Sequence, residues 1–254
     1  MASSFFDPWV RWQMERNGTS HLLPVFYYDT TSVSAVFTAQ SARIKELLPH
    51  PAMQPLEWSP GRGLVVITGF EYRRCDLAPY NEVSIAFLVA FGNRPLPGIS
   101  AARALLSRTI PVYIWQLPVT TEEARVGGID LAGYPKFLAQ IDFARDDDWI
   151  TCTLAEGGQE ILQLRGRRLQ TDVGRQLRYV TYTMVQGSPL IVDVLVNPIA
   201  YAETLAGGAA ELTLGTGHAV SETLGQLGLG QRNVVYQYSP VNEAVLFPAR
   251  NVLE

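Results

Sequence analysis

The chain has 254 residues, a formal net charge of −4 at pH 7 and an isoelectric point near 5.5. It has no surplus of cations to displace the counterions of a phosphate backbone, which excludes nucleic acid as the main partner. Hydrophobic residues make up 47% of the sequence and charged residues 17%, enough for a sizeable core. No apolar run approaches the roughly 18 residues of a membrane-spanning helix, and the first residues do not resemble a signal peptide. We therefore expect no membrane partner and a cytoplasmic protein.

The cysteines and histidines are few and far apart. Cys75 and Cys152 are the only thiols, and the histidines stand at positions 21, 50 and 218. None of these spacings is typical of a zinc site. A disulfide is possible, but a chain with a large core does not need one, so we expect free, buried thiols.

The N-terminal half alternates short helices with strands. Asp7 can cap a helix, Pro8 suits the first helical position, and Asn17-Gly18 would end it, so residues 1–21 are predicted to form a helical extension. Thr120-Thr-Glu-Glu predicts a short helix that Gly127-Gly128 would close. The other expected elements are strands at 25–28, 32–37, 64–72, 80–91 and 111–117, and helices at 39–48 and 99–107.

Beyond residue 137 the pattern changes to strands at hairpin spacing. Turns rich in Asp and Gly separate the segments 138–143, 149–155, 160–165, 176–184 and 191–196, and further strands are expected at 211–214 and 234–238 with a helix near 220–226. No linker or repeat divides the chain. We therefore predict a single domain over 1–254 of the α+β class, mostly antiparallel β with short helices on its outside.

Motifs for other chemistries are incomplete. Leu214-Gly-Thr-Gly-His-Ala-Val has valine in place of the third glycine of a dinucleotide-binding turn, and no βαβ alternation surrounds it. Gly98-Ile-Ser-Ala-Ala lacks the closing glycine of a nucleophile elbow. The arginine-rich stretch 165–178 alternates with apolar residues, as a solvated hairpin face or a subunit contact does. No metal, flavin, nicotinamide or pyridoxal phosphate is implied.

Lys136 is one of two lysines, and it has unusual neighbours. Lys45 lies in a polar helical stretch, whereas Lys136 follows Tyr134-Pro135 and precedes Phe137-Leu, with no acid within five residues. Apolar surroundings lower the pKa of an amine, and a neutral amine can attack a carbonyl to form a Schiff base. The alternative is a lysine whose stem packs on the sheet while its ammonium group reaches water.

Glu82 is the second candidate. In Tyr80-Asn-Glu-Val-Ser-Ile-Ala-Phe it begins an apolar strand, where Glu82, Ser84 and Ala86 share one face. A carboxylate on the inner face of a barrel is costly unless it is paired or transfers protons. The alternative is a solvated glutamate at the start of a strand.

Five segments together resemble the acetoacetate decarboxylase-like superfamily. They are Leu23-Pro-Val-Phe-Tyr-Tyr-Asp, Glu46-Leu-Leu-Pro, Ile67-Thr-Gly-Phe-Glu-Tyr, Pro79-Tyr-Asn-Glu-Val, and the run from Val126 through Gly133-Tyr-Pro-Lys to Ile141. The resemblance covers about residues 22 to 245. It implies an open antiparallel β-barrel packed into homo-oligomers, a Schiff-base role for Lys136, and a proton-transferring or water-positioning role for Glu82. Activation of a lysine in this way is a known feature of acetoacetate decarboxylase itself.

The sequence departs from the decarboxylase pattern at several charged positions, including the cationic residues that lie beside the reactive lysine or bind the substrate carboxylate. Phe137 stands where decarboxylases have a second lysine, Thr30 aligns with the arginine that handles the substrate carboxylate, and Ile67 aligns with a second acid. Gly128-Ile-Asp replaces an expected arginine and glutamate. Desolvation by Phe137 would still lower the pKa of Lys136, as a neighbouring cation does.

The resemblance therefore predicts a Schiff-base lyase whose small-molecule carbonyl substrate is larger and more apolar than acetoacetate. Loss of carbon dioxide, aldol-type cleavage or condensation, and dehydration are all compatible with an imine on Lys136. The predicted catalytic residues are Lys136 and Glu82, and the predicted pocket walls are Tyr27, Tyr28, Tyr80, Trp115 and Phe137. Arg73, Arg74 and Arg125 are candidates to replace the missing cations. The alternative is a small-molecule-binding barrel that has lost the chemistry.

Overall fold

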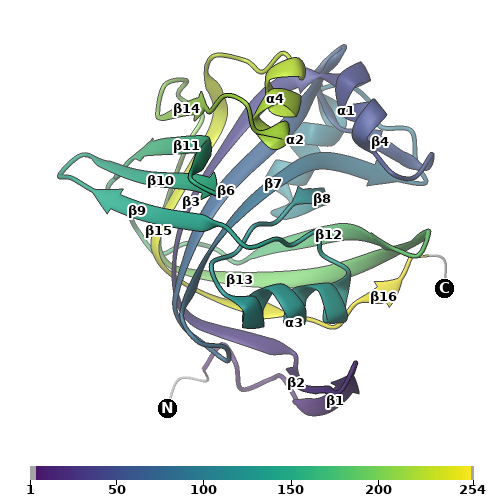
Figure 1. Ribbon diagram of the computed structural model, residues 1–254. Helices are drawn as coiled ribbons and strands as arrows, with labels where there is room; N and C mark the ends of the chain where they lie inside the picture. The colour runs from purple at the N-terminus through teal and green to yellow at the C-terminus, as the bar shows by residue number, and fades with distance from the viewer. Residues whose placement is uncertain (1–3, 253–254) are drawn as a thin grey trace.

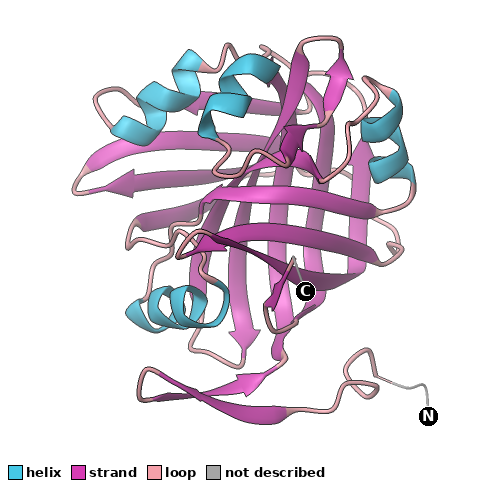
Figure 2. Cartoon of the chain, turned by 90° about the vertical axis from the view of Figure 1, so that its right-hand side faces the viewer, coloured by secondary structure: helices cyan, strands magenta, loops and turns pink. Residues whose placement is uncertain are grey.

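The protein is an antiparallel β-barrel with short helices at its ends, as the computed structural model of residues 4–252 shows (Figures 1 and 2). The predicted fold class is confirmed. The barrel strands follow one another around the ring in the order β7 (Tyr80–Phe91), β8 (Thr109–Gln116), β12 (Leu177–Val185), β13 (Ser188–Thr204), β15 (Asn233–Leu246), β3 (Val25–Gln40) and β6 (Arg62–Cys75). Pairing of β6 with β7 closes the ring, and the β8–β12 pair is parallel.

A second sheet covers the outside of the barrel. It consists of β9 (Gln140–Arg145), β10 (Trp149–Glu156), β11 (Gln159–Arg167) and β14 (Ala210–Leu214). Gly69 of β6 lets the two layers approach, because a Cβ atom there would lie 2.7 Å from the sulfur of Cys152 on β10. The remaining short strands are β4 (Met53–Pro55), β5 (Glu57–Ser59) and β16 (Arg250–Asn251).

The barrel strands bury both faces. On β6, Ile67 packs outward against the second sheet, whereas Val66 packs into the lumen. This two-residue alternation explains why β6 and β7 carry long apolar runs. Three helices lie together at one end of the molecule: α1 (Ser41–Leu47), α2 (Ile99–Leu106) and α4 (Ala219–Gln226) (Figure 1). The opposite end of the lumen lies next to α3 (Glu122–Ala132) and an N-terminal hairpin.

The N-terminal segment is a β-hairpin, so the predicted helical extension is wrong. Strands β1 (Trp12–Arg16) and β2 (Thr19–Leu23) pair across Asn17 and Gly18. Both turn residues have positive φ, 50° and 78°, as a two-residue hairpin turn requires. The Asn-Gly pair that we interpreted as a helix end is thus a hairpin turn. Residues 1–3 of the predicted extension lie outside the described residues.

Two other boundaries differ from the prediction. Residues 29–31, which separate the predicted strands 25–28 and 32–37, lie inside the continuous strand β3. The pairing of β3 with β6 is irregular at these residues. Gly127 and Gly128 do not close α3, which continues to Ala132 and ends at Gly133 in the left-handed region with φ of 62°. Within the helix, Gly128 leaves room for the Lys136 side chain, since a Cβ atom at this position would lie 2.4 Å from Lys136 Cε.

The described residues contain no helix long and apolar enough to cross a membrane. Cys75 and Cys152 are both free thiols, as predicted, and Cys152 is fully buried. Within residues 4–252, no group of three histidine, cysteine or acidic side chains is placed to hold a metal ion.

Candidate active site

Glu82 lies on the inner face of the barrel, opposite Phe70 of β6. Its neighbours fix this position. The side-chain amide of Asn81 donates to the carbonyl of Ile141 at 2.9 Å, and the backbone N–H of Val83 donates to the carbonyl of Pro118 at 3.0 Å. Because Asn81 and Val83 are held on the other face, the two-residue alternation of β7 turns Glu82 into the lumen.

Lys136 reaches the same point from the segment after α3. This segment runs beside residues 117–119, since Leu117 N–H donates to Pro135 and Val119 N–H donates to Phe137. Tyr134 and Lys136 both line the lumen, whereas Phe137 packs on the opposite side in the core beneath the second sheet.

The two predicted catalytic residues form a buried pair. Lys136 Nζ donates to Glu82 Oε2 at 2.7 Å, and the Lys136 and Glu82 side chains are only 6% and 8% exposed. Tyr72 donates its hydroxyl proton to the other carboxylate oxygen at 3.2 Å. The sequence neighbours of Lys136 suggested purely apolar surroundings. The structure differs, because the carboxylate of Glu82 lies next to the amine. This carboxylate is placed to take a proton from the amine or return one.

Tyrosine hydroxyls surround this pair. Tyr27 and Tyr80 hydrogen-bond to each other at 3.3 Å, and Tyr134 bonds to Thr181 at 2.8 Å. Burial raises the pKa of each of these phenols and that of Tyr72, and the nearby Glu82 carboxylate adds to the shift. They are therefore neutral hydrogen-bonding groups at pH 7 and cannot act as bases.

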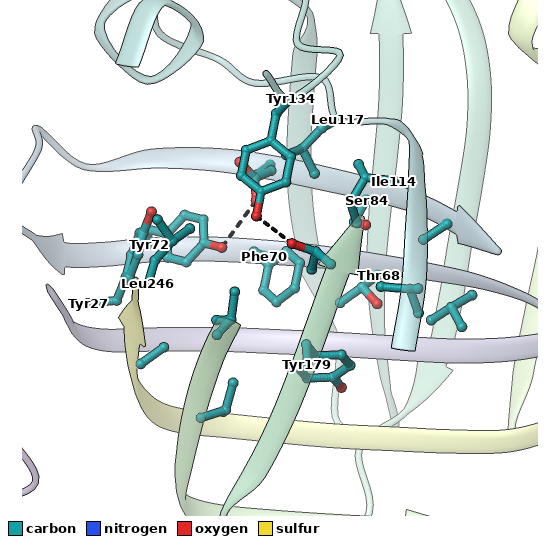
Figure 3. Close-up of a pocket in the computed structure, with 18 of the residues that line it drawn as sticks. Tyr27, Thr68, Phe70, Tyr72, Ser84, Ile114, Leu117, Tyr134, Tyr179 and Leu246 are labelled. Carbon is teal, nitrogen blue, oxygen red and sulfur yellow. Dashed lines mark hydrogen bonds between the residues drawn. The ribbon is translucent and has the colours of Figure 1, made fainter. Parts of the chain in front are cut away.

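The pair stands beside an apolar cavity in the lumen of about 110 Å³. Figure 3 shows Tyr27 and Tyr72 near one end, with Thr68 and Ile114 toward the other. Its walls come from alternate residues of the barrel strands, chiefly Val66, Thr68, Phe70, Ser84, Val112, Ile114, Tyr179, Val194, Val196, Ala244 and Leu246. Burial raises the pKa of Tyr179 to about 12, so this wall residue is also un-ionised.

A second cavity, of about 290 Å³, lies on the other side of the pair. We call it the vestibule. Hairpin strand β2, helix α3 and residues 76–80 form its walls, and it shares Tyr27, Tyr134, Lys136 and Leu246 with the lumen cavity. Lys136 therefore faces both cavities.

The predicted pocket walls are partly corrected. Tyr27 lines both cavities and Tyr80 lines the vestibule, where its ring centroid lies 5.6 Å from Lys136 Nζ. Tyr28 points outward and donates to Asp76, since strand alternation places it on the opposite face from Tyr27. Trp115 and Phe137 belong to the core beneath the second sheet, for the same reason.

Sequence reasoning missed Tyr72, Tyr134, Tyr179 and His21. Of these, only Tyr134 carried a usable signal, because it precedes Lys136 by two residues on an extended segment.

None of the three candidate arginines enters either cavity. Arg73 binds Asp29 through two nitrogens, Arg74 lies over the ring of Tyr28, and Arg125 pairs with Glu122. Thr30, which aligns with the family's arginine, is buried and carries no charge. The lining of the lumen cavity contains Lys136 and Glu82 as its ionisable pair and no other cation.

The comparison with family models decides the family. The model for acetoacetate decarboxylase (ADC) matches residues 9–235. The chain belongs to this family. Among solved structures, the acetoacetate decarboxylase from Legionella pneumophila is 15% identical with a TM-score of 0.62, and the alignment covers 98% of this chain and 93% of that one. An acetoacetate decarboxylase-like enzyme from Sphingomonas wittichii is 15% identical with a TM-score of 0.56, covering 90% and 94%.

The enduracididine biosynthesis enzyme MppR, solved in complex with pyruvate, is 14% identical with a TM-score of 0.57, covering 90% of each chain. No curated protein matches the chain. At these identities the structural likeness shows the shared fold, and membership of the family supports an enzyme.

Proposed function

We propose that this protein is a lyase that forms a Schiff base between Lys136 and a carbonyl substrate. The observation that carries this proposal is the buried Lys136–Glu82 pair at 2.7 Å, placed where two cavities meet. Burying a cation and an anion costs desolvation free energy, so a buried pair is typical of a functional site or of a well-bonded structural one. This pair lies next to cavities that can hold a ligand, which favours the functional role.

The pair supplies each proton that imine formation needs. Glu82 takes a proton from Lys136 Nζ, and the neutral amine attacks the carbonyl carbon. Glu82 returns this proton to the oxygen of the adduct and then relays a second proton from the nitrogen to the same oxygen, which leaves as water while the C=N bond forms. The resulting iminium accepts the electron pair of the bond that breaks beside it, which gives an enamine and releases carbon dioxide or a second carbonyl compound. Glu82 next takes up a proton, from water after loss of carbon dioxide or from the substrate hydroxyl in an aldol-type cleavage, and passes it to the enamine carbon. Water then hydrolyses the imine and releases the product.

The lumen favours an apolar substrate body. Its walls are aliphatic and aromatic with a few neutral hydroxyl groups, and no arginine enters to hold a carboxylate there. Its volume of about 110 Å³ takes several water-sized groups, which need about 10–15 Å³ each. We therefore propose a keto acid or ketone whose alkyl or aryl arm enters the lumen, in place of a substrate as small and polar as acetoacetate.

Reductive trapping tests the imine directly. The protein is incubated with sodium cyanoborohydride and a panel of ketones and keto acids, and intact mass with peptide mapping locates any adduct. We expect one adduct on Lys136 in the wild type. The Lys45→Arg variant, in which Lys136 is the only lysine, should give the same adduct, and Lys136→Met should give none on this peptide.

Glu82→Gln refines the test. The amide keeps the shape but cannot transfer protons, so we expect the adduct to form about 100-fold more slowly or worse. An adduct that persists on the same peptide in Lys136→Met, or no adduct with any carbonyl compound, would refute the Schiff-base proposal. Calorimetric binding without an adduct would instead identify a binding barrel that has lost the chemistry.

A further inference from the structure

The vestibule contains a histidine that the proposed chemistry does not use. His21 lies on β2, and its side chain lines the vestibule together with Lys136. The neighbouring Leu22 is 41% exposed whereas Leu23 is fully buried, so His21 shares the inward face of the hairpin with Leu23. The hairpin therefore places His21 in the wall of the vestibule.

The Nε2 atom of His21 is buried and has no hydrogen-bond partner. A buried imidazole nitrogen without a partner is unfavourable, and a ligand in the same cavity can remove the penalty. The two acidic side chains of the vestibule are already engaged. Asp76 accepts from Arg11, Tyr28 and the backbone of Phe26, and the exposed Glu123 accepts from the backbone of Ala78 at 3.3 Å. His21 thus lines the vestibule with a buried polar atom that has no hydrogen-bond partner in the described structure.

Two adjacent glycines place His21 and Lys136 against the same part of α3. A Cβ atom at Gly127 would lie 3.9 Å from His21 Cε1, and one at Gly128 would lie 2.4 Å from Lys136 Cε. Glycine inside a helix costs about 1 kcal/mol relative to alanine. Gly128 therefore has a spatial use, since it leaves room for the Lys136 side chain, whereas a Cβ atom at Gly127 would make ordinary van der Waals contact with His21. Both side chains line the vestibule, so a small molecule that fills it contacts both.

We propose that the vestibule is a second substrate subsite, in which His21 Nε2 donates a hydrogen bond to an oxygen on the arm of the substrate that leaves the lumen. This deepens the proposed function, on which it rests. Lys136 attacks the carbonyl, the apolar arm fills the lumen, and the outward arm carries a second oxygen group, either a carboxylate or a hydroxyl. His21 thereby provides the oxygen recognition that the absent arginines do not. It acts by binding, and the proton transfers remain with Glu82.

Three ligands with one shared hexyl chain test the subsite: an α-keto acid, an α-hydroxy ketone and a methyl ketone. Binding is measured by calorimetry to Lys136→Met/Glu82→Gln, which cannot form an imine and has no uncompensated buried charge, with and without His21→Leu. We expect His21→Leu to weaken binding of the keto acid or the hydroxy ketone about tenfold or more. Binding of the methyl ketone should stay within about twofold. His21→Gln, which retains a donor, should restore part of the loss.

His50 provides the matched control. Its ring stacks on Phe91 and lies outside both cavities, so His50→Gln should leave all three affinities unchanged. If the affinity of the keto acid depends on His21, the recognised group is a carboxylate. If the affinity of the hydroxy ketone depends on His21, the recognised group is a neutral oxygen. Equal weakening of all three ligands would show that His21 only supports the structure, and no weakening of any would also overturn the subsite. Both results are independent of imine trapping, which decides the proposed function separately.

Discussion

Removing the amine of Lys136 should destabilise the fold far more than removing both members of its pair. The Lys136 and Glu82 side chains are over nine-tenths buried, and Nζ lies 2.7 Å from Oε2. In Lys136→Met the carboxylate keeps only the hydroxyl of Tyr72, at 3.2 Å, as a polar partner. Leaving one member of a buried pair uncompensated costs about 3–5 kcal/mol of unfolding free energy.

The double variant Lys136→Met/Glu82→Gln removes both charges and leaves a neutral amide near Tyr72. Replacing a whole buried pair is often neutral in stability, so we expect a loss of about 1 kcal/mol or less. The coupling energy from the double-mutant cycle should then be about 2 kcal/mol or more.

Urea unfolding at pH 7 measures these differences, with the slope of each transition checked for two-state behaviour. Arg125→Met serves as a control, because its pair with Glu122 is at the surface and its loss should not be detectable. If Lys136→Met is as stable as the wild type, or if the double variant loses as much as the two single variants together, the buried-pair geometry is wrong.

The remaining predictions concern the glycine beside Lys136 and the buried phenols. Gly128→Ala places a methyl group 2.4 Å from Lys136 Cε, so it should lower the rate of imine trapping about tenfold. Gly225→Ala in α4 is the control, because a Cβ atom there would have no neighbouring atom within 4 Å. It should leave the trapping rate unchanged and raise the free energy of unfolding by up to about 1 kcal/mol. Unchanged trapping in Gly128→Ala would show that the lysine does not pack against α3. Since burial raises the pKa of Tyr27, Tyr72, Tyr80, Tyr134 and Tyr179, these phenols should stay protonated above pH 10 in the folded protein while tyrosines of the unfolded chain ionise. The unfolded state then binds fewer protons, so stability should fall as pH rises past about 10; ultraviolet titration showing ordinary ionisation of all the tyrosines near pH 10 would contradict this.

Local sequence predicted most of the barrel strands, but it left an alternative open for both Lys136 and Glu82, and the resemblance to the family favoured them as site residues. The alternation of residues 80–91 by itself predicts that Glu82, Ser84 and Ala86 share one face, because side-chain direction in a strand follows from its period of two. The Tyr80-Asn-Glu and Gly133-Tyr-Pro-Lys segments indicated the family, and the family model and the fold confirm that assignment.

Where local signals were ambiguous, the sequence was less reliable. Asn17-Gly18 is compatible with a helix end or a hairpin turn, and the pairing of β1 with β2 decided the matter. Gly127-Gly128 is typical of a helix end, but α3 continues through both residues to Ala132, and Gly128 leaves room there for the Lys136 side chain.

Only the tertiary structure decided which side chains meet. Lys136 and Glu82 are 54 residues apart, and their contact depends on two segments that are both fastened to residues 117–120. Three further features depend on the register between distant strands: the exclusion of Phe137 and Trp115 from the pocket, the engagement of Arg73 by Asp29, and the unpaired nitrogen of His21. Local sequence sets the direction of a side chain relative to its own strand, whereas what lies on that side is set by chain segments far away in the sequence.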